Sequence, residues 1–144
     1  MDLPAHIDPK TWEKVRTAFA EALGLDEDEV SYDSKVIGDL GAESLDFLDI
    51  AFRLERAFDI KIPRGGIERT AQTGMGDEPY EVAGVLTPLA LEKLAEAMPE
   101  IPRAEFREGL RTSEMATLFR VATFYNLVLH LVAEKAAEKA AASA

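Results

Sequence analysis

Apolar side chains recur every three or four residues in several stretches of the chain, and each such stretch predicts an amphipathic helix. The first is expected from Asp8 to Gly24, because Asp8 and Pro9 are residue types that begin helices and glycine commonly ends them. Its apolar stripe comprises Trp12, Val15, Phe19 and Leu23. The spacing predicts that this stripe faces the core.

A second helix is expected from about Leu45 to Phe58, with Ser44 at the capping position before it. This helix is apolar on two nearly opposite sides. One stripe comprises Leu45, Leu48 and Phe52, and the other comprises Phe47, Ile50, Leu54 and Phe58. A helix of this kind is wedged between neighbours or lines a cavity. In the polar sector, Arg53 follows Asp49 by four residues, which predicts a local ion pair.

The connection between these helices is acidic from Asp26 to Glu29. A calcium loop of the EF-hand type beginning at Asp26 needs glycine and glutamate where the chain has Ser31 and Ile37, so we expect a solvated loop. Four apolar residues are expected to anchor the connection to the core: Val30, Tyr32, Val36 and Ile37.

The second half of the chain begins with an irregular stretch at residues 64–79, rich in glycine. A brief extended or turning segment is expected at Tyr80–Leu86, and Thr87 with Pro88 opens a helix that runs to about Met98. Pro102 then opens a short helical piece at Arg103–Leu110.

The last helix is expected to start at Glu114, with Thr112 or Ser113 as its cap, and to reach at least Ala133. Its middle is apolar almost all round but too short for a membrane span, which needs about 20 apolar residues. This indicates a buried helix, with a partner-binding or dimer face as the alternative.

Charge and cysteine content narrow the function. The 144-residue chain carries a net charge of −11 and no cysteine. Such a charge disfavours binding to nucleic acid or anionic membranes and favours basic partner surfaces. Without cysteine there is no disulfide or thiolate metal site, and no secretory signal opens the chain, so the cytoplasm is the expected compartment. The two histidines, His6 and His130, predict neither a metal site nor a catalytic triad.

The stretch around Ser44 resembles the acyl carrier protein family. The resemblance rests on an Asp-Leu-Gly turn at Asp39–Gly41, followed by an acidic residue, Ser44 and Leu45, and on the ending Phe58–Pro63. It is similar in particular to the subtype that carries very-long-chain hydroxy fatty acids for lipid A. The match is strong over residues 8–63 and weak over 80–98. It implies that 4′-phosphopantetheine from coenzyme A is esterified to Ser44.

The resemblance also implies partners and their contact residues. Expected partners are a phosphopantetheinyl transferase (holo-ACP synthase), ketosynthases and acyltransferases of a fatty-acid or lipid pathway, besides the acyl cargo. The docking role falls on Glu43, Asp46, Asp49 and Glu55. Candidates for the acyl pocket are Leu45, Phe47, Leu48, Phe52, Leu54, Ile60 and Ile62. Arg53 and Arg56 dilute a face that is more uniformly acidic in general fatty-acid carriers.

These expectations describe a non-catalytic carrier with an all-α fold. We expect a single domain over residues 1–144, with a carrier core at 8–63, an insertion at 64–111 and a long last helix at 112–142. Its bundle should hold the first two helices roughly antiparallel. Two alternatives remain open: a carrier domain for polyketide or peptide assembly, and an unmodified helical module for protein interaction.

Overall fold

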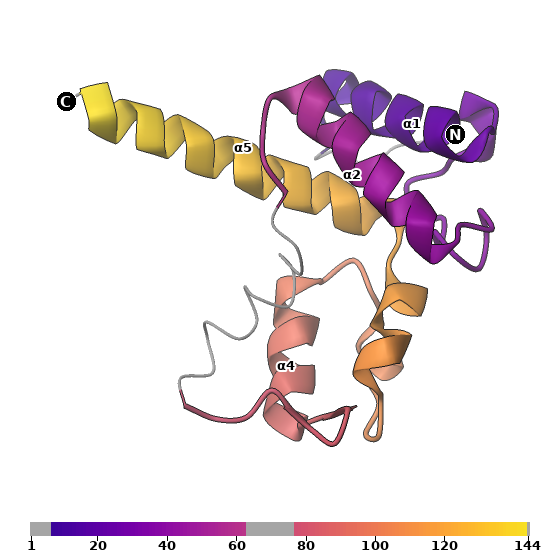
Figure 1. The fold of residues 1–144 in the computed structure, drawn as a ribbon, viewed down its shortest axis with the longest axis vertical. Helices are drawn as coiled ribbons and strands as arrows, with labels where there is room; N and C mark the ends of the chain where they lie inside the picture. Colours follow the sequence, from indigo (N-terminus) through magenta and orange to yellow (C-terminus); the bar gives the residue numbers. More distant parts are fainter. Residues whose placement is uncertain (1–6, 63–76, 144) are drawn as a thin grey trace.

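The computed structural model describes residues 7–62 and 77–143. The elements in chain order are α1 (Pro9–Leu23), η1 (Glu27–Glu29), α2 (Ser44–Phe58), β1 (Glu81–Val82), β2 (Val85–Leu86), α4 (Pro88–Ala97), η2 (Arg103–Glu105), η3 (Thr112–Leu118) and α5 (Val121–Ser143), where η denotes a 3-10 helix (Figure 1). The predicted all-α fold is confirmed, with one two-stranded hairpin added. Most of the irregular stretch expected at 64–79 lies outside the described residues, as does His6.

Helix α1 begins and ends where its local signals predict. The Asp8 carboxylate accepts hydrogen bonds from the Thr11 amide at 3.0 Å and the Thr11 hydroxyl at 2.7 Å. At the other end Gly24 takes a φ of +68°, a left-handed conformation that glycine adopts without strain, and its amide bonds the Ala20 carbonyl. Both ends are therefore encoded within one helical turn.

Helix α2 runs antiparallel to α1 and uses one of its two apolar stripes for packing (Figure 1). Glu21 near the end of α1 pairs with Arg53, whereas Lys14, earlier in α1, lies over the ring of Phe58, later in α2. On the inward stripe Ile50 and Leu54 are fully buried. The antiparallel arrangement expected for the first two helices is confirmed.

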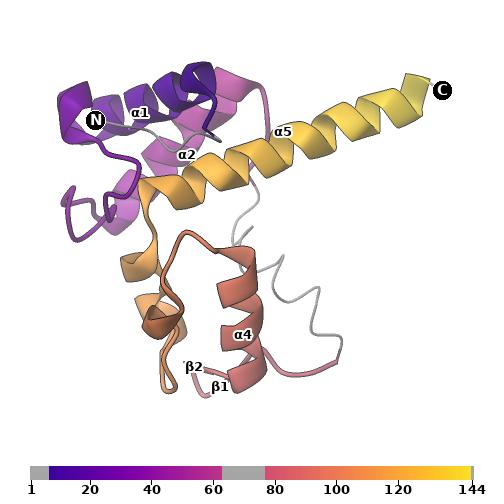
Figure 2. The same ribbon diagram turned by 180° about the vertical axis from the view of Figure 1, so that it is seen from behind.

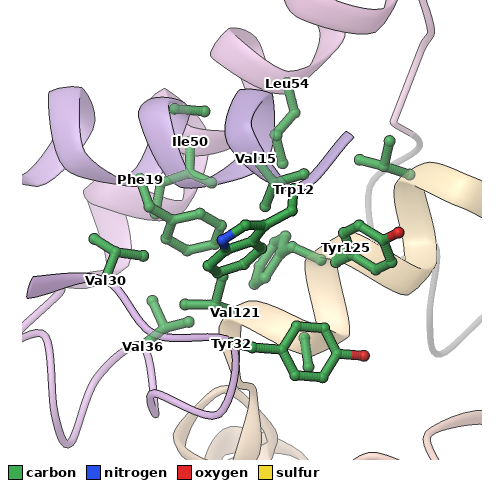
Figure 3. Close-up of a cluster of buried hydrophobic side chains, with 14 of the residues drawn as sticks. Trp12, Val15, Phe19, Val30, Tyr32, Val36, Ile50, Leu54, Val121 and Tyr125 are labelled. Atoms are coloured by element: carbon green, nitrogen blue, oxygen red, sulfur yellow. The ribbon is translucent and has the colours of Figure 1, made fainter. Parts of the chain in front are cut away.

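The carrier core gathers side chains from α1, α2, the 30–36 connection and the first half of α5 (Figure 3). Aromatic rings meet edge to face at its centre: Trp12 with Tyr32 at 5.9 Å, Tyr32 with Tyr125 at 5.8 Å, and Phe19 with Phe124 at 5.4 Å between centroids. Edge-to-face geometry sets the positive edge of one ring against the negative face of the next. Three of the four residues expected to anchor the connection are buried, and Ile37 is half-buried.

A second apolar core forms inside the inserted region, defined here as residues 77–118. The hairpin turns at Ala83 and Gly84, which both have positive φ. At its end, the Leu86 amide donates a hydrogen bond to the Leu110 carbonyl at 2.9 Å. Helix α4, capped by Thr87 as predicted, packs against the hairpin and η3 (Figure 2). This inserted core comprises Leu86, Ala90, Leu91, Leu94, Ala95, Met98, Ile101, Phe106, Leu110, Met115 and Leu118.

The helical piece expected at Arg103–Leu110 is wrong beyond its first three residues, because only Arg103–Glu105 is helical. Phe106 leaves the helical conformation at ψ 61°, and Gly109 turns the chain at φ +89°. This turn brings Leu110 into the inserted core and its carbonyl to the hairpin.

The expected start of the last helix at Glu114 is also wrong. Residues 112–118 form the 3-10 helix η3, and α5 starts only at Val121. The break occurs because the backbone around Phe119 pairs with the distant connection: the Val36 amide bonds the Phe119 carbonyl and the Val121 amide bonds the Ser34 carbonyl, both at 3.0 Å. An extended residue cannot also continue a helix.

Helix α5 is buried along its first half only. Val121, Ala122, Tyr125 and Val128 are buried, whereas Leu129 and Val132 are 40% and 39% exposed. Its second half extends beyond the other elements in both views (Figures 1 and 2). The prediction of a buried helix therefore holds for its first part. Among the described residues, no helix is both long and apolar enough to cross a lipid bilayer.

Candidate functional site

The loop before α2 is a compact turn that fixes where the helix starts. Backbone amides of Asp39 and Leu40 bond the Lys35 carbonyl at 2.9 and 3.1 Å. Gly41 has a φ of +73°, a left-handed conformation that is unfavourable for residues other than glycine. The next residue, Ala42, is buried, and its amide donates to the Val36 carbonyl at 3.1 Å. The turn thus delivers Ser44 to the first position of α2.

Glu43, not Ser44, is the N-cap of α2, which corrects the expected capping role of Ser44. Glu43 is extended, at φ −110° and ψ 171°, and its amide donates to the Asp46 carboxylate at 2.7 Å. With Glu43 as the cap and Asp46 reaching back to its amide, the helix begins one residue earlier than a serine cap at position 44 requires. Ser44 is left as the first helical residue.

The start of α2 fits a phosphodiester attached at Ser44. The helix dipole places partial positive charge at this end, which favours an anionic phosphate, and the carboxylates of Glu43 and Asp46 lie at the same end. The neighbours of Ser44 are open to solvent: Glu43 is exposed and Leu45 is 77% exposed. A tethered group leaving this position therefore meets solvent rather than the core.

The four predicted docking residues lie along α2 in different environments. Glu43 and Asp46 form the acidic helix start, and Asp49 follows one turn later. Asp49 accepts from Arg53 at 3.0 Å, so the predicted local pair is confirmed, and Arg53 also contacts Glu21 at 2.9 Å. Glu55 lies near the opposite end, where its carboxylate accepts from the Ile62 amide at 2.7 Å.

The candidate acyl-pocket residues divide between two faces. Leu54 and Ile60 are buried in the carrier core, and Phe47 and Ile62 pack against it half-buried. The other three lie on the outward face, where Leu45, Leu48 and Phe52 are 77%, 48% and 63% exposed. The structure therefore brings four candidates together and leaves three on the surface.

Phe47 joins an aromatic cluster with two residues from the second half of the chain. Its ring lies 6.5 Å from that of Phe119 and 5.9 Å from that of Phe124. Phe119 packs against both the carrier core and the inserted core. Phe47 lies less than one helical turn after Ser44 on α2. The aromatic cluster is therefore an apolar surface close to the attachment position, on the inward side of the helix. No local signal pairs these residues, because Phe119 comes from the far half of the chain.

Comparison with known proteins points to the same segment. A family model described as a phosphopantetheine attachment site matches residues 13–67. Over 53 residues the chain is 49% identical to the acyl carrier protein AcpXL of Brucella melitensis, covering 37% of this chain and 57% of that protein. The match therefore spans less than two thirds of the Brucella protein.

Two further relatives are covered more completely. The chain is 40% identical over 63 residues to the acyl carrier protein of Clostridium acetobutylicum, covering 44% of this chain and 82% of that protein. It is 38% identical over 61 residues to the acyl carrier protein of Thermotoga maritima, covering 42% of this chain and 75% of that protein. Each of these matches covers less than half of this chain.

Proposed function

Because the chain belongs to the acyl carrier protein family, we propose that Ser44 carries the 4′-phosphopantetheine arm and that acyl groups are held as thioesters on its thiol. The observation that supports this assignment most directly is the position of Ser44 within the matched segment, at the solvent-facing start of α2. The assignment therefore rests on membership of the family, on exposed neighbours at Glu43 and Leu45, and on a helix end whose dipole favours a phosphate.

In this proposal the protein performs no bond chemistry. The turn at Gly41 and the cap at Glu43 fix the point from which the arm swings, and the helix end stabilises the phosphate. The arm itself supplies the thiol. By tethering the acyl group, the carrier raises its effective concentration at each partner's active site.

Intact mass after co-expression with a phosphopantetheinyl transferase tests the attachment. The wild-type chain should gain the mass of one arm, Ser44→Ala should gain none, and the control Ser113→Ala, at an exposed serine in η3, should gain it fully. An arm on Ser44→Ala would assign the site elsewhere. An unmodified wild type with several transferases would favour an interaction module without a prosthetic group.

We further propose that Glu43, Asp46, Asp49 and Glu55 dock basic surfaces of the transferase and of the pathway enzymes. Asp49→Lys should lower kcat/KM of the transferase at low salt. The loss should shrink as ionic strength rises, because exposed charges are screened over about 8 Å at physiological salt. The control Asp33→Lys reverses an exposed charge outside α2. Equal losses at low and high salt would indicate damage to the fold instead.

The acyl chain is proposed to lie on the inward side of α2, against Phe47, Leu54, Ile60 and Ile62. Burying each methylene is worth about 0.8 kcal/mol, so sheltering a longer chain stabilises the loaded protein more. Phe119, Phe124 and the inserted region extend this apolar surface. We therefore propose that the inserted region enlarges or covers the acyl site.

Acyl chains of increasing length, loaded on the holo protein, test the acyl site. Thermal stability relative to the unloaded holo form should climb with chain length beyond medium chains. Chemical shifts should move in Leu89–Met98 and Phe119–Leu131. A flat series with shifts confined to the Ser44 loop would remove the inserted region from the proposal. Leu45, Leu48 and Phe52 can bind the acyl chain only if it lies along the outer surface of α2. Chemical-shift changes at these three residues would reveal such binding.

The pathway is proposed to be a specialised fatty-acid or lipid pathway of the cytoplasm, with ketosynthases and acyltransferases as partners. The support is the identity of 49% to AcpXL over 53 residues together with the inserted region. Mass spectrometry of the acyl groups on protein purified from its own cells tests this. Long saturated or hydroxylated chains are expected, whereas polyketide or aminoacyl intermediates would favour an assembly-line carrier.

A further inference from the structure

A groove of 610 Å³ runs between α1 and α2, away from Ser44. Its charged lining comprises the cationic residues Lys10, Lys14, Arg53 and Arg56 and the carboxylates Glu13 and Glu21. Cations therefore outnumber carboxylates two to one in this groove, although the whole chain carries a net charge of −11. A local excess of positive charge on an acidic chain requires an explanation, because nothing in the attachment site uses it.

Most of that positive charge is not compensated inside the protein. Arg53 is neutralised by Glu21 and Asp49, at 2.9 and 3.0 Å. Lys14 lies 5.4 Å from the centre of the Phe58 ring, which holds its position without neutralising it. Over residues 7–62 and 77–143, neither Lys10 nor Arg56 makes an ion pair, and both are exposed. The groove thus presents three available cations.

Helix α2 consequently has an acidic start and, in its last turn, a cation that lines the groove. Its start carries Glu43 and Asp46, whereas Arg56 lies in its last turn beside the lysines of α1. At 1.5 Å per residue, Arg56 is about 18 Å along the helix from Ser44. The two charged surfaces are therefore far enough apart to meet different parts of one partner.

We propose that this basic groove binds an acidic segment of a partner protein and thereby fixes the orientation in which the carrier docks. The three available cations are spread over a turn of α1 and across to α2, which matches carboxylates distributed along a chain better than one compact anion. Glu13 and Glu21 further limit how closely a phosphate can be surrounded. The net charge of −11 opposes adsorption to an anionic membrane. The proposal does not depend on modification of Ser44.

The test uses the whole chain and a short peptide of alternating glutamate and serine as the probe. Backbone amide shifts are followed by NMR, with the same peptide carrying glutamine in place of glutamate as the matched control. Saturable shifts are expected in residues 10–21 and 53–58 with the acidic peptide, and none with the glutamine peptide. The association should weaken as salt rises, because exposed charges are screened.

Two variants locate the binding. Lys10→Glu combined with Arg56→Glu should weaken the peptide's association by about tenfold or more, because like charges then face the probe. Arg56→Gln should have a smaller effect, and since Arg56 is exposed, its loss should leave the spectrum of the core unchanged. The control Lys93→Glu, on α4, should bind the peptide like the wild type.

Three results would overturn the proposal. Inorganic phosphate that saturates the groove as tightly as the peptide would assign it to small anions. Preferential binding to phosphatidylglycerol vesicles, lost in the double variant, would assign it to a membrane. Peptide shifts that persist in the double variant, or that spread over the lysines of α4 and α5, would show only non-specific attraction.

Discussion

The carrier core and the inserted core are assembled from the chain in opposite ways. The carrier core joins α1, α2, the 30–36 connection and α5, which are distant in sequence, through edge-to-face aromatic contacts. The inserted core comes from one continuous stretch, Leu86–Leu118, and is almost entirely aliphatic and methionine. The carrier core therefore depends on contacts that close long loops, whereas the inserted core depends on neighbours in sequence.

Among the described residues, a few specific contacts join the two cores. Phe119 packs against both. Arg120, almost buried, donates to the Glu105 carboxylate at 2.7 Å, and Asn126 donates to Glu100 at 3.0 Å. With so narrow a junction, damage to one core should reach the other only in part.

Phe19→Ala should have the largest effect, because it removes a fully buried ring from the centre of the carrier core. Loss of a buried phenylalanine costs about 3–5 kcal/mol in the free energy of unfolding, and Leu94→Ala in the inserted core costs about 2–5 kcal/mol. The two variants should differ in how many elements of the structure they destabilise. Hydrogen exchange should speed up throughout α1, α2 and α5 in Phe19→Ala, but mainly within 77–118 in Leu94→Ala.

Urea unfolding with exchange read by mass spectrometry measures both variants. If Leu94→Ala exposed α1 and α2 as much as Phe19→Ala does, the two cores would be one cooperative unit and the distinction between them would fail.

Glu105→Gln should have an intermediate effect by weakening the junction. It leaves the Arg120 guanidinium, whose side chain is 10% exposed, with a neutral partner and the Leu118 carbonyl at 3.3 Å. Because the Glu105 side chain is 25% exposed, the substitution should lower the free energy of unfolding by about 1–3 kcal/mol, less than the loss of a fully buried ion pair. The control is Glu108→Gln, at an exposed site on the same segment.

Residual dipolar couplings compare the orientation of α4 relative to α1 in these two variants. Glu105→Gln should loosen that orientation while each core keeps its own chemical shifts. An unchanged orientation would mean that Phe119 and the backbone pairing at 34–36 suffice to hold the junction.

Lys135→Gln should have the smallest effect and should stay within the carrier region. Lys135 bonds the Asp59 carboxylate at 2.7 Å and thereby ties the exposed half of α5 to the end of α2. The hydrogen bond and charge of Lys135 lower the pKa of Asp59. The tie is therefore present at neutral pH and is lost as pH falls through that lowered pKa.

Protection of the amides of residues 129–143, measured as exchange relative to the intrinsic rate at each pH, should fall with acid in the wild type, whereas in Lys135→Gln it should be low already at neutral pH. Lys139→Gln, which acts on Asp59 through charge alone, should change it less. Acid fraying of equal size in wild type and Lys135→Gln would mean that the Asp59 tie does not hold the helix.

Sequence reasoning succeeded where a helix is specified by its own ends. Asp8, Gly24 and Thr87 act on backbone groups within one turn of themselves, so α1 and α4 begin where the sequence predicts. It failed at residues 112–120, because the backbone there pairs with Lys35 and Val36, more than half the chain away. No local pattern encodes such a partner.

The candidate site shows the same division. The position of Ser44 at the start of an amphipathic helix follows from adjacent residues, although the Glu43 cap makes it the first helical residue rather than the cap. Which apolar stripe of α2 faces inward does not follow from the helix alone, because both stripes consist of large apolar side chains. Contacts with Phe119 and Phe124 decide it, and these residues lie in the other half of the sequence.

The pairing of residues 32–36 with residues 119–122 has a consequence for biosynthesis. The ribosome completes Leu86–Leu118 before it adds the start of α5, whose residues fill the carrier core and bond the Ser34 and Tyr32 carbonyls. The nascent chain therefore contains every residue of the inserted core before it contains the α5 residues of the carrier core. In order of synthesis, the last residue of the inserted core therefore precedes the α5 residues that complete the serine-bearing bundle.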